Sequence, residues 1–337
     1  MRALITGSEG YLGGFISAEL LARGHSVVGL DNFVKYGPGR PAFGSHPRYR
    51  FVFGDAKDVE TVSRLALECD VFIAAAALTG GVGYLDAKAY EILAENERIT
   101  AAAFDAAVAA HRGAELNRIV LISSSAVYEN AFVIPTPESH AAACPAPRTT
   151  YGLQKLSAEF FAKSAHEAYG LPYTIIRPFN VAGLVPALEP DDGPDRSGRQ
   201  VWEGTHVIPE LTRKILRGQE PLRILGDGSQ VRYFTHGRDL AAGILSAALH
   251  PGAENETFNL SGDEAVSVRS LAERLWARLA PGKSLALAFD PPCGSEVSTR
   301  APDVAKAAKI LGFQAAIRLD AIIDEVVYWA RETMRGE

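Results

Sequence analysis

TGSEGYLG, residues 6–13, places three glycines between an apolar, β-branched run and an amphipathic stretch. The preceding RALIT, residues 2–6, has the composition of a buried strand. After the glycines, apolar residues recur at helical spacing from Leu12 to Leu20, which predicts a helix over residues 11–23. The stretch therefore predicts a strand, a tight turn and a helix in direct succession.

Glycines at such a turn favour the binding of a dinucleotide. Gly7, Gly10 and Gly13 allow a tight turn, a close approach of a pyrophosphate to backbone N–H groups, and tight packing of the helix on the strand. The second strand, SVVGL, leads into Asp31, whose carboxylate can accept hydrogen bonds from both hydroxyls of an adenosine ribose. A 2′-phosphate would meet the same negative charge, so NAD is favoured over NADP. Asp55, after the third predicted strand, can face the adenine edge or serve only as a turn residue.

Short β-branched runs alternate with longer helical stretches, which is typical of a parallel sheet covered by helices. The predicted strands are RALIT, SVVGL, RFVFG, DVFIA, RIVLIS and YTIIR. Long helices are predicted at 89–112 and 151–169. A Pro-, Gly- and Asp-rich stretch follows at 184–200, and after it come two more helices and a short returning strand, at 206–222, 236–249 and 256–261.

We therefore expect an α/β fold with a doubly wound parallel sheet. The sheet domain should comprise residues 1–181, with 236–261 returning to it. A smaller C-terminal, substrate-binding lobe should consist of 182–235 and 262–337. This lobe should cover the C-terminal ends of the strands, where open α/β sheets bind their ligands.

The composition limits the class of protein. The 337 residues are 47% apolar and 22% charged, as in a globular chain, and their net charge of −6 argues against a general nucleic-acid binder. No apolar stretch reaches the roughly 20 residues of a membrane span, and no signal-peptide pattern follows Met1. The three cysteines lack the paired spacing of a metal site. We expect a soluble, cytoplasmic protein that binds no metal, membrane or nucleic acid.

Tyr151 and Lys155 lie four residues apart at the start of a predicted helix, so their side chains share one face. An ammonium beside a phenol favours the phenolate, which can act as a base. The same spacing also occurs in helices where it has only a structural role. Ser124, at the end of a predicted strand, can orient a substrate oxygen against Tyr151, and Asn96 on the long helix can give polar support.

Six motifs occur together in an order and at separations typical of one family: TGSEGYLG, Asp31, GDAKD, SSSAVY, YGLQK and RPFN. The chain resembles the extended short-chain dehydrogenase/reductase family, and within it the nucleotide-sugar epimerases and dehydratases, including UDP-glucose 4-epimerase-like enzymes. The resemblance continues to the C-terminal motif RAPDVAKAAKILGF. It implies a Rossmann-type domain that holds NAD, the catalytic trio Ser124, Tyr151 and Lys155, and a nucleoside-diphosphate sugar in the cleft under the C-terminal lobe.

The resemblance implies two sets of binding residues. The cofactor set is Gly7, Gly10, Tyr11, Leu12, Gly13, Asp31, Asn32, Asp55, Ala56, Ala75, Asn96, Ser123, Tyr151, Lys155, Pro178 and Asn180. The substrate set is Thr79, Val82, Ser125, Asn180, His206, Val207, Arg232 and Arg300. Asn180 and Arg232 match family residues that contact the diphosphate. The match of Arg300 is looser: it can replace a diphosphate-binding arginine, line the sugar pocket or lie in solvent.

The resemblance also bears on the reaction. After the catalytic Ser or Thr, 4,6-dehydratases of the family have an Asp and a Glu, 3,5-epimerases and fucose-type reductases a Cys, and glucuronate decarboxylases a Glu; this chain has Ser125 and Ala126. A 4-epimerase needs none of these groups. By elimination we expect NAD-dependent epimerisation at C4 through a transient 4-keto sugar. The alternatives are an NDP-sugar reductase, dehydratase or 3,5-epimerase with a non-standard acid or base, or a noncatalytic NAD-binding module.

Two features keep those alternatives open. LTGGVGYLDAK, residues 78–88, is either a sugar-contacting loop like that of mannose-type 3,5-epimerases and fucose-type reductases, or a tight turn into the long helix. Glu129 and His206 are candidates for an unusual acid or base, or for structural roles. For the assembly, we expect a homodimer formed through the two long helices at 89–112 and 151–169.

Overall fold

Seven parallel strands form the central sheet of the protein. The computed structural model describes residues 1–37, 43–113, 116–185, 206–291 and 297–334. The strands lie in the order β11-β6-β5-β4-β1-β2-β3, and every neighbouring pair is parallel. Their bounds are β1 Arg2–Thr6, β2 Ser26–Asp31, β3 Tyr49–Phe53, β4 Val71–Ala74, β5 Arg118–Ile122, β6 Tyr173–Pro178 and β11 Glu256–Leu260. This sheet confirms the expected α/β fold.

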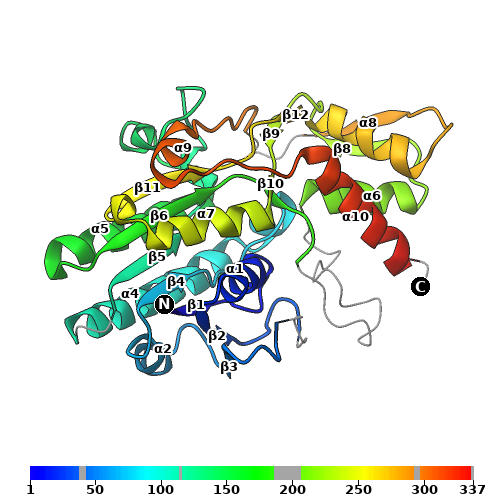
Figure 1. Cartoon of the computed structure of the whole chain (residues 1–337). Helices are drawn as coiled ribbons and strands as arrows, with labels where there is room; N and C mark the ends of the chain where they lie inside the picture. The colour runs from blue at the N-terminus through cyan, green and yellow to red at the C-terminus, as the bar shows by residue number, and fades with distance from the viewer. Residues whose placement is uncertain (38–42, 114–115, 186–205, 292–296, 335–337) are drawn as a thin grey trace.

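Helices cover both faces of the sheet, as Figure 1 shows. One face packs against α1 and α7, and the other against α2, α4 and α5. Both faces of the strands are therefore buried, which explains why the strand sequences are continuous apolar runs; in β5 all five residues are buried. These helices are α1 Tyr11–Ala22, α2 Val59–Ala66, α4 Ala89–Arg112, α5 Thr150–Tyr169 and α7 Gly237–Leu249.

The strand order reverses beside β1. From β1 the chain runs outward through β2 and β3, and it then returns to β4 on the other side of β1. In open α/β sheets, ligands bind in the crevice at such a reversal, at the carboxyl ends of the strands. The glycine turn at residues 7–10 leaves β1 at this crevice.

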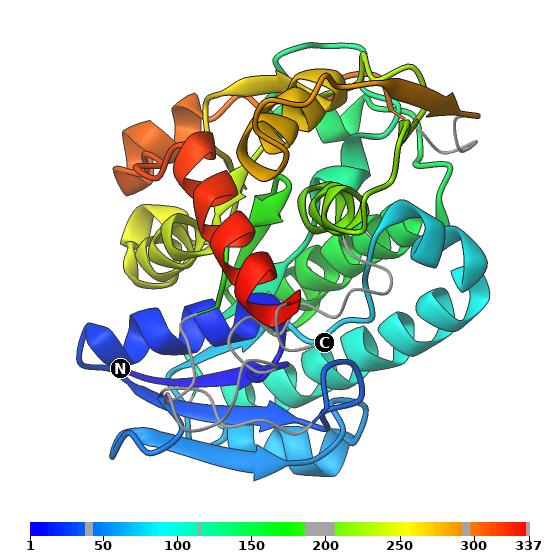
Figure 2. The ribbon, with the colours of Figure 1, turned by 90° about the vertical axis from the view of Figure 1, so that its right-hand side faces the viewer.

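A smaller lobe lies beyond the carboxyl ends of the strands (Figures 1 and 2). Its core joins α6, α8 and α10 through buried aliphatic side chains and Trp276. Two small sheets extend it, one pairing β8 with β13 and one pairing β9 with β12. Its elements are α6 Val207–Leu216, β8 Leu222–Leu225, β9 Val231–Tyr233, β12 Ala265–Ser267, α8 Val268–Leu279, β13 Leu287–Asp290 and α10 Leu319–Met334.

Short elements connect the two parts. β7 pairs with β10 where the chain leaves the sheet and returns to it, and α9 packs near β11. The short elements are α3 Val82–Ala87, β7 Val181–Ala182, β10 Thr235–His236, α9 Ala305–Leu311 and the 3-10 helices Ser125–Tyr128, Glu138–Ala142 and Pro251–Ala253.

The helix predicted over 206–222 is shorter than expected. α6 ends at Leu216, and Gly218, at φ +70°, turns the chain before Pro221 and the strand β8. Glycine adopts this left-handed backbone without strain, and proline cannot continue a helix, so the apolar residues that follow belong to a strand. Most of the Pro-rich stretch, from residue 186 onward, lies outside the described residues. None of the helices in the described ranges has the length and apolar character to cross a membrane.

Candidate functional site

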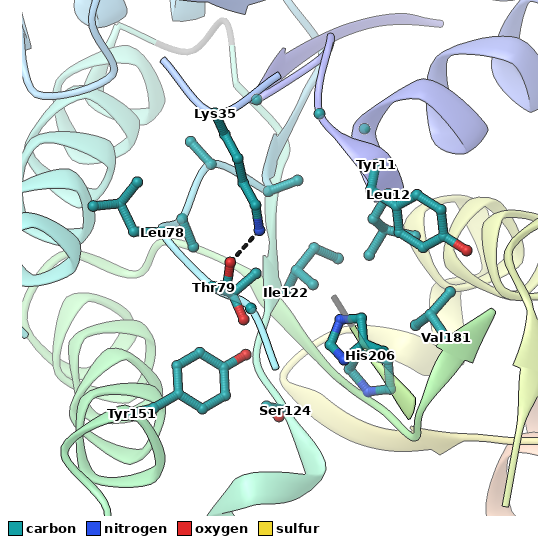
Figure 3. Close-up of a pocket in the computed structure, with 18 of the residues that line it drawn as sticks. Tyr11, Leu12, Lys35, Leu78, Thr79, Ile122, Ser124, Tyr151, Val181 and His206 are labelled. Carbon is teal, nitrogen blue, oxygen red and sulfur yellow. Dashed lines mark hydrogen bonds between the residues drawn. The ribbon is translucent and has the colours of Figure 1, made fainter. Parts of the chain in front are cut away.

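A cavity of about 680 Å³ lies between the carboxyl ends of the strands and the C-terminal lobe, and Figure 3 shows part of its lining. Its walls come from the β1–α1 turn, the ends of β2, β4, β5 and β6, the start of α5, and the lobe. The predicted site residues that line it are Gly7, Gly10, Tyr11, Leu12, Gly13, Asp31, Asn32, Asp55, Ala56, Ala75, Thr79, Ser123, Ser124, Ser125, Tyr151, Lys155, Pro178, Asn180, His206, Arg232 and Arg300. The fold thus gathers most of the two predicted sets around one space.

Two predicted residues, Asn96 and Val207, are placed differently, and a third, Val82, has a side chain that is not described. Asn96 is buried beside the cavity, where its amide accepts from the backbone N–H of Leu78 at 2.7 Å and donates to the carbonyl of Leu78 at 2.9 Å. It fixes the loop after β4 and does not line the cavity itself. Val207 begins α6 and packs against the core of the lobe. Val82 begins α3, and its side chain lies outside the described part of the chain.

The glycine turn forms a tight cradle under the cavity. Gly7 has φ +73°, and a Cβ at Gly13 would lie 1.9 Å from the carbonyl oxygen of Gly7. No side chain larger than hydrogen fits at Gly13, because the neighbouring atoms belong to the backbone. Gly10 precedes α1 and offers no side-chain cap, so the N–H groups of the first turn remain available to a ligand. A cradle of this kind fits the pyrophosphate of a dinucleotide.

Asp31 is fixed at the end of β2. Its Oδ2 accepts from the N–H of Glu9 at 3.0 Å, and its Oδ1 accepts from the N–H of Phe33 at 2.8 Å. Each carboxylate oxygen can accept a second hydrogen bond, and the group lines the cavity beside the glycine turn. Asn32 approaches Asp55 at 3.5 Å and so connects the ends of β2 and β3. The residues present therefore fit NAD, with Asp31 as the acceptor for its ribose hydroxyls.

Tyr151 and Lys155 lie on the first turns of α5 and face the cavity. The helix begins after Thr149, whose side chain caps it by accepting from the N–H of Gly152 at 3.0 Å. The Lys155 ammonium lies 5.9 Å from the centre of the Tyr151 ring and donates to the carbonyl of Ile122 at 2.9 Å. In Figure 3 the Tyr151 hydroxyl points into the cavity. A phenol next to a fixed cation is suited to take and return a proton.

Ser124 completes the trio at the end of β5. It caps the following 3-10 helix, because its Oγ accepts from the N–H of Ala126 at 3.1 Å. Its own hydroxyl proton remains available as a donor toward the cavity, where Figure 3 places Ser124 near Tyr151. The hydroxyl of Ser123 has another partner, since it donates to Glu159 Oε1 at 2.6 Å. Ser123 therefore contributes to the cavity wall while its polar group points inward to the protein.

A buried ion pair connects the two elements that carry the trio to the neighbouring strand β6. Arg177 on β6 and Glu159 on α5 are 2.6 Å apart, with side chains only 2% and 1% exposed. Glu159 lies two turns after Tyr151 on the same helix, and it also receives the hydroxyl of Ser123 at the end of β5. This network connects α5, β5 and β6 directly beneath the reacting groups, and a fully satisfied buried network of this kind gives rigidity.

Glu129 has a structural position at the start of α5. Its carboxylate accepts from the N–H groups of Arg148 and Thr149, both at 2.9 Å, and from the Thr149 hydroxyl. Three donors therefore hold Glu129 against the segment that leads into Tyr151. This arrangement favours the structural interpretation of Glu129 over an acid or base role.

Lys35 is a cavity residue that was not among the predicted set. Its ammonium crosses the cavity and donates to the carbonyl of Thr79 (Figure 3). Burial lowers its pKa to about 8, and no described carboxylate raises it. The available sequence signal was its place in the loop four residues after Asp31, at the same end of the sheet as the glycine turn.

His206 lies at the opposite wall, just before α6. The surrounding protein lowers its pKa to about 4, and the charge of Lys35 acts in the same direction. The side chain is nevertheless exposed to solvent, and water around the ring reduces this effect of burial. Because the ordinary pKa of histidine is already about 6.5, a lowered pKa leaves His206 a neutral imidazole at neutral pH.

Two arginines of the lobe reach the cavity from neighbouring segments, Arg232 from β9 and Arg300 from the irregular chain beside it. Arg232 on β9 donates to the carbonyl of Val231 at 2.9 Å. Arg300 has a buried Nε with no hydrogen-bond partner among the described residues. Desolvation lowers the pKa of Arg300, while Glu129 and Tyr151 counteract this electrostatically.

Comparison with known proteins agrees with this site. The model of the NAD dependent epimerase/dehydratase family matches residues 3–261. A UDP-glucose 4-epimerase of Corynebacterium glutamicum is 32% identical over 282 residues, which cover 81% of this chain and 79% of that protein. A UDP-glucose 4-epimerase of Lacticaseibacillus casei is 28% identical over 352 residues, which cover 100% of this chain and 98% of that protein.

Solved structures share the whole fold. A dTDP-glucose 4,6-dehydratase double mutant from Streptomyces venezuelae, with NAD bound, superposes with a TM-score of 0.82 at 26% identity, covering 100% of this chain and 98% of that one. A UDP-glucose 4-epimerase of Thermotoga maritima with UDP-glucose gives a TM-score of 0.82 at 24% identity, covering 99% and 100%. The family match confirms the predicted cofactor, NAD, for which the glycine cradle and Asp31 provide the fit. The chain therefore belongs to the NAD dependent epimerase/dehydratase family.

Proposed function

We propose that the protein inverts the configuration at C4 of a nucleoside-diphosphate sugar. The observation that carries this proposal is the combination of Ser124, Tyr151 and Lys155 at one cavity whose adjoining wall is Ser125 and Ala126. That wall contains a hydroxyl and a methyl group, but no carboxylate or thiol. Two relatives, from C. glutamicum and L. casei, are named UDP-glucose 4-epimerases, which supports the same reaction here.

The residues of the cavity suit a reversible oxidation at C4. NAD, when bound, supplies the hydride acceptor at the sugar carbon and returns the hydride afterwards. Tyr151 takes the proton of the C4 hydroxyl and later gives it back, and Lys155 stabilises the phenolate by its charge. Ser124 donates a hydrogen bond to the sugar oxygen and holds it against Tyr151. The keto sugar then needs only space to present its other face.

The other reactions require groups that this site does not offer in the usual place. Elimination of water, loss of carbon dioxide and proton exchange at C3 or C5 each need an additional acid or base beside the sugar. Glu129 is held by three hydrogen bonds to the start of α5. His206, a neutral imidazole on the cavity wall, is the group that supports a second candidate function, a 3,5-epimerase.

A substrate panel separates these functions. The purified protein is incubated in deuterated water with UDP-, GDP-, CDP-, ADP- and dTDP-sugars, and the products are followed by NMR and mass spectrometry. We expect inversion at C4 with unchanged mass and no net use of NAD. Deuterium at C3 or C5 would favour the 3,5-epimerase, and consumption of NADH or loss of water would favour a reductase or dehydratase.

For the assembly, we propose a homodimer formed through the outer faces of α4 and α5. The two helices pack against each other, and their outer surface exposes Tyr90, Leu153 and Phe160 at 76%, 45% and 60%. Light scattering after size exclusion should give a dimer mass for the wild type and a monomer mass for Phe160→Glu. A monomeric wild type would exclude the dimer.

A cytoplasmic location stays a prediction of the sequence.

A further inference from the structure

His236 is a buried imidazole at the boundary between the sheet domain and the lobe. It ends β10 and caps α7, and its side chain is only 2% exposed. Its Nδ1 accepts from the backbone N–H of Arg238 at 3.0 Å, so the proton of the neutral ring is on Nε2. The Nε2–H group donates to Glu325 Oε2 at 2.7 Å. Both ring nitrogens are therefore engaged, and the ring has one fixed orientation.

Glu325 connects His236 to the middle of α10, the C-terminal helix of the lobe. Asp239, near the start of α7, anchors the beginning of the same helix, because it accepts from the N–H groups of Ala316 and Ile317 at 2.9 and 2.8 Å. Glu325 lies about two helical turns further along the chain. Two anchors at separate points fix the direction of a helix as well as its position.

His236 also packs against the helix that begins the cofactor half of the cavity. Tyr11, in the first turn of α1, lines the cavity, and its hydroxyl donates to the carbonyl of Gly183 at 2.6 Å. A Cβ at Gly183 would lie 2.4 Å from His236 Nε2, so only glycine fits beside the ring. The Phe15 ring lies edge-on to the rings of both Tyr11 and His236, with centres 5.5 and 5.7 Å apart. His236 therefore contacts both α1, which follows the glycine turn, and α10.

The hydrogen bond to α10 bears on the reaction because the cavity is divided between the two parts of the molecule. Tyr151 belongs to the sheet domain, whereas Arg232 and His206 belong to the lobe. Val326 on α10, directly after the second anchor, lines the same cavity. A ligand that contacts both parts is placed correctly only while they keep their relative position, and a misplacement of about 1 Å can lower a rate about a hundredfold.

We propose that His236 and Glu325 are positioning residues that hold the lobe in register with the reacting groups of the sheet domain. This inference rests on the proposed function, which places a sugar nucleotide between the two parts. Neither residue lines the cavity, so the pair acts through α10 and not by contact with the substrate. Loss of the hydrogen bond should therefore lower the turnover number, while each part keeps its own binding residues.

Two substitutions remove this hydrogen bond in different ways. Glu325→Ala removes the acceptor, whereas His236→Asn keeps an acceptor for the N–H of Arg238 and is too short to reach Glu325. For both we expect kcat on the accepted sugar nucleotide to fall about tenfold, with the Kd of UDP for the NAD-loaded protein changed less than about threefold and bound NAD at the parent level. Glu325→Gln retains an acceptor and should keep about half of the parent kcat or more.

The matched control is Asp324→Ala. Asp324 is the neighbour of Glu325 on α10, and its partner Arg278, at 2.5 Å, belongs to the same lobe, so kcat should equal that of the parent protein. Hydrogen–deuterium exchange of the NAD-loaded proteins adds a readout that needs no turnover. The amides of β7 and β10, which join the two parts, should exchange faster in Glu325→Ala and at the parent rate in Asp324→Ala.

Three results would overturn the proposal. The first is a kcat at the parent level in both Glu325→Ala and His236→Asn. The second is a loss of UDP or NAD binding as large as the loss of kcat, which would show a general role in stability. The third is unchanged exchange at β7 and β10 in Glu325→Ala. Failure of the proposed function is recognised separately, as the absence of C4 inversion for every sugar nucleotide of the substrate panel, and the exchange measurement then still tests the hydrogen bond.

Discussion

The two halves of the cavity are assembled in different ways. The cofactor half consists of short motifs that directly follow consecutive strands, such as the glycine turn after β1 and Asp31 at the end of β2. The substrate half is assembled from separate segments, with Thr79 from a loop after β4 and His206, Arg232 and Arg300 from the lobe. Backbone geometry therefore determines the first half locally, while packing between distant segments determines the second.

Tyr151 belongs to both halves, and its loss should have the largest effect. Tyr151→Phe removes the hydroxyl that exchanges a proton with the substrate, and we expect kcat to fall by about a thousandfold. The bound NAD, measured by absorbance after denaturation, should remain at the level of the parent protein because the glycine cradle and Asp31 are untouched.

Tyr169→Phe is the matched control, since Tyr169 is an exposed residue at the other end of α5. It should retain the activity of the parent protein. Full activity of Tyr151→Phe would show that the catalytic assignment is wrong.

Substitution at Gly13 tests how strictly the cofactor half is determined. A Cβ at Gly13 would lie 1.9 Å from the Gly7 carbonyl oxygen, so Gly13→Ala must displace the backbone of the turn. We expect a loss of about 3 kcal/mol in the free energy of unfolding and loss of bound NAD. Gly113→Ala, at the C-terminal end of α4, meets its nearest atom at 3.4 Å and should lose far less. Equal stability of the two variants would contradict the tight cradle.

Glu129 tests the junction between the halves. Glu129→Gln keeps the shape of the side chain but removes the negative charge of the carboxylate that accepts from the N–H groups of Arg148 and Thr149. We therefore expect a free energy of unfolding lower by about 2 kcal/mol and a lower kcat. Glu167→Gln, exposed near the C-terminal end of α5, is the control. If Glu129→Gln keeps its stability and only the acid limb of the pH–rate profile moves, Glu129 is an acid or base and not a positioning residue.

Lys35→Met should give the smallest effect, a change of about 1 kcal/mol in the free energy of unfolding, because water in the open cavity screens the charge of Lys35. Burial lowers its pKa in the folded protein from 10.5 to about 8. Between these values the unfolded chain binds the proton and the folded protein releases it, so the free energy of unfolding rises with pH in this window. Denaturant titrations from pH 7.5 to 10.5 should show this rise in the parent protein relative to Lys35→Met. Parallel curves would contradict the buried position of the ammonium.

The same contrast explains what the sequence could predict. The strands and the helices α1, α4 and α5 follow from local patterns with fixed spacing. The trio Ser124, Tyr151 and Lys155 was implied by the resemblance of several motifs to one family, and the fold brings its members to one cavity. α6 ends at Leu216 because Gly218 and Pro221 interrupt the helix. The apolar periodicity over 206–222 had instead predicted a helix through the whole segment. Boundaries of this kind depend on single turn residues more than on the pattern.

Side-chain partners were harder to predict than positions. Asn96 was expected at the cofactor and instead holds the backbone of Leu78, and Lys35 was missed although it reaches Thr79 across the cavity. Neither contact is encoded in a short motif, because the partners are 18 and 44 residues away in sequence. The role of Glu129 likewise became clear only when its donors in residues 148 and 149 were located.

The central claim is that the hydrogen removed from C4 returns to C4 on the opposite face. The most direct measurement uses the accepted sugar nucleotide labelled with deuterium at C4, incubated with the protein in ordinary water and followed by NMR. We predict that the product with inverted C4 retains its deuterium and that no solvent hydrogen replaces those at C3 and C5. Loss of the label from C4, or an unlabelled product that has lost water or carbon dioxide, would contradict the claim.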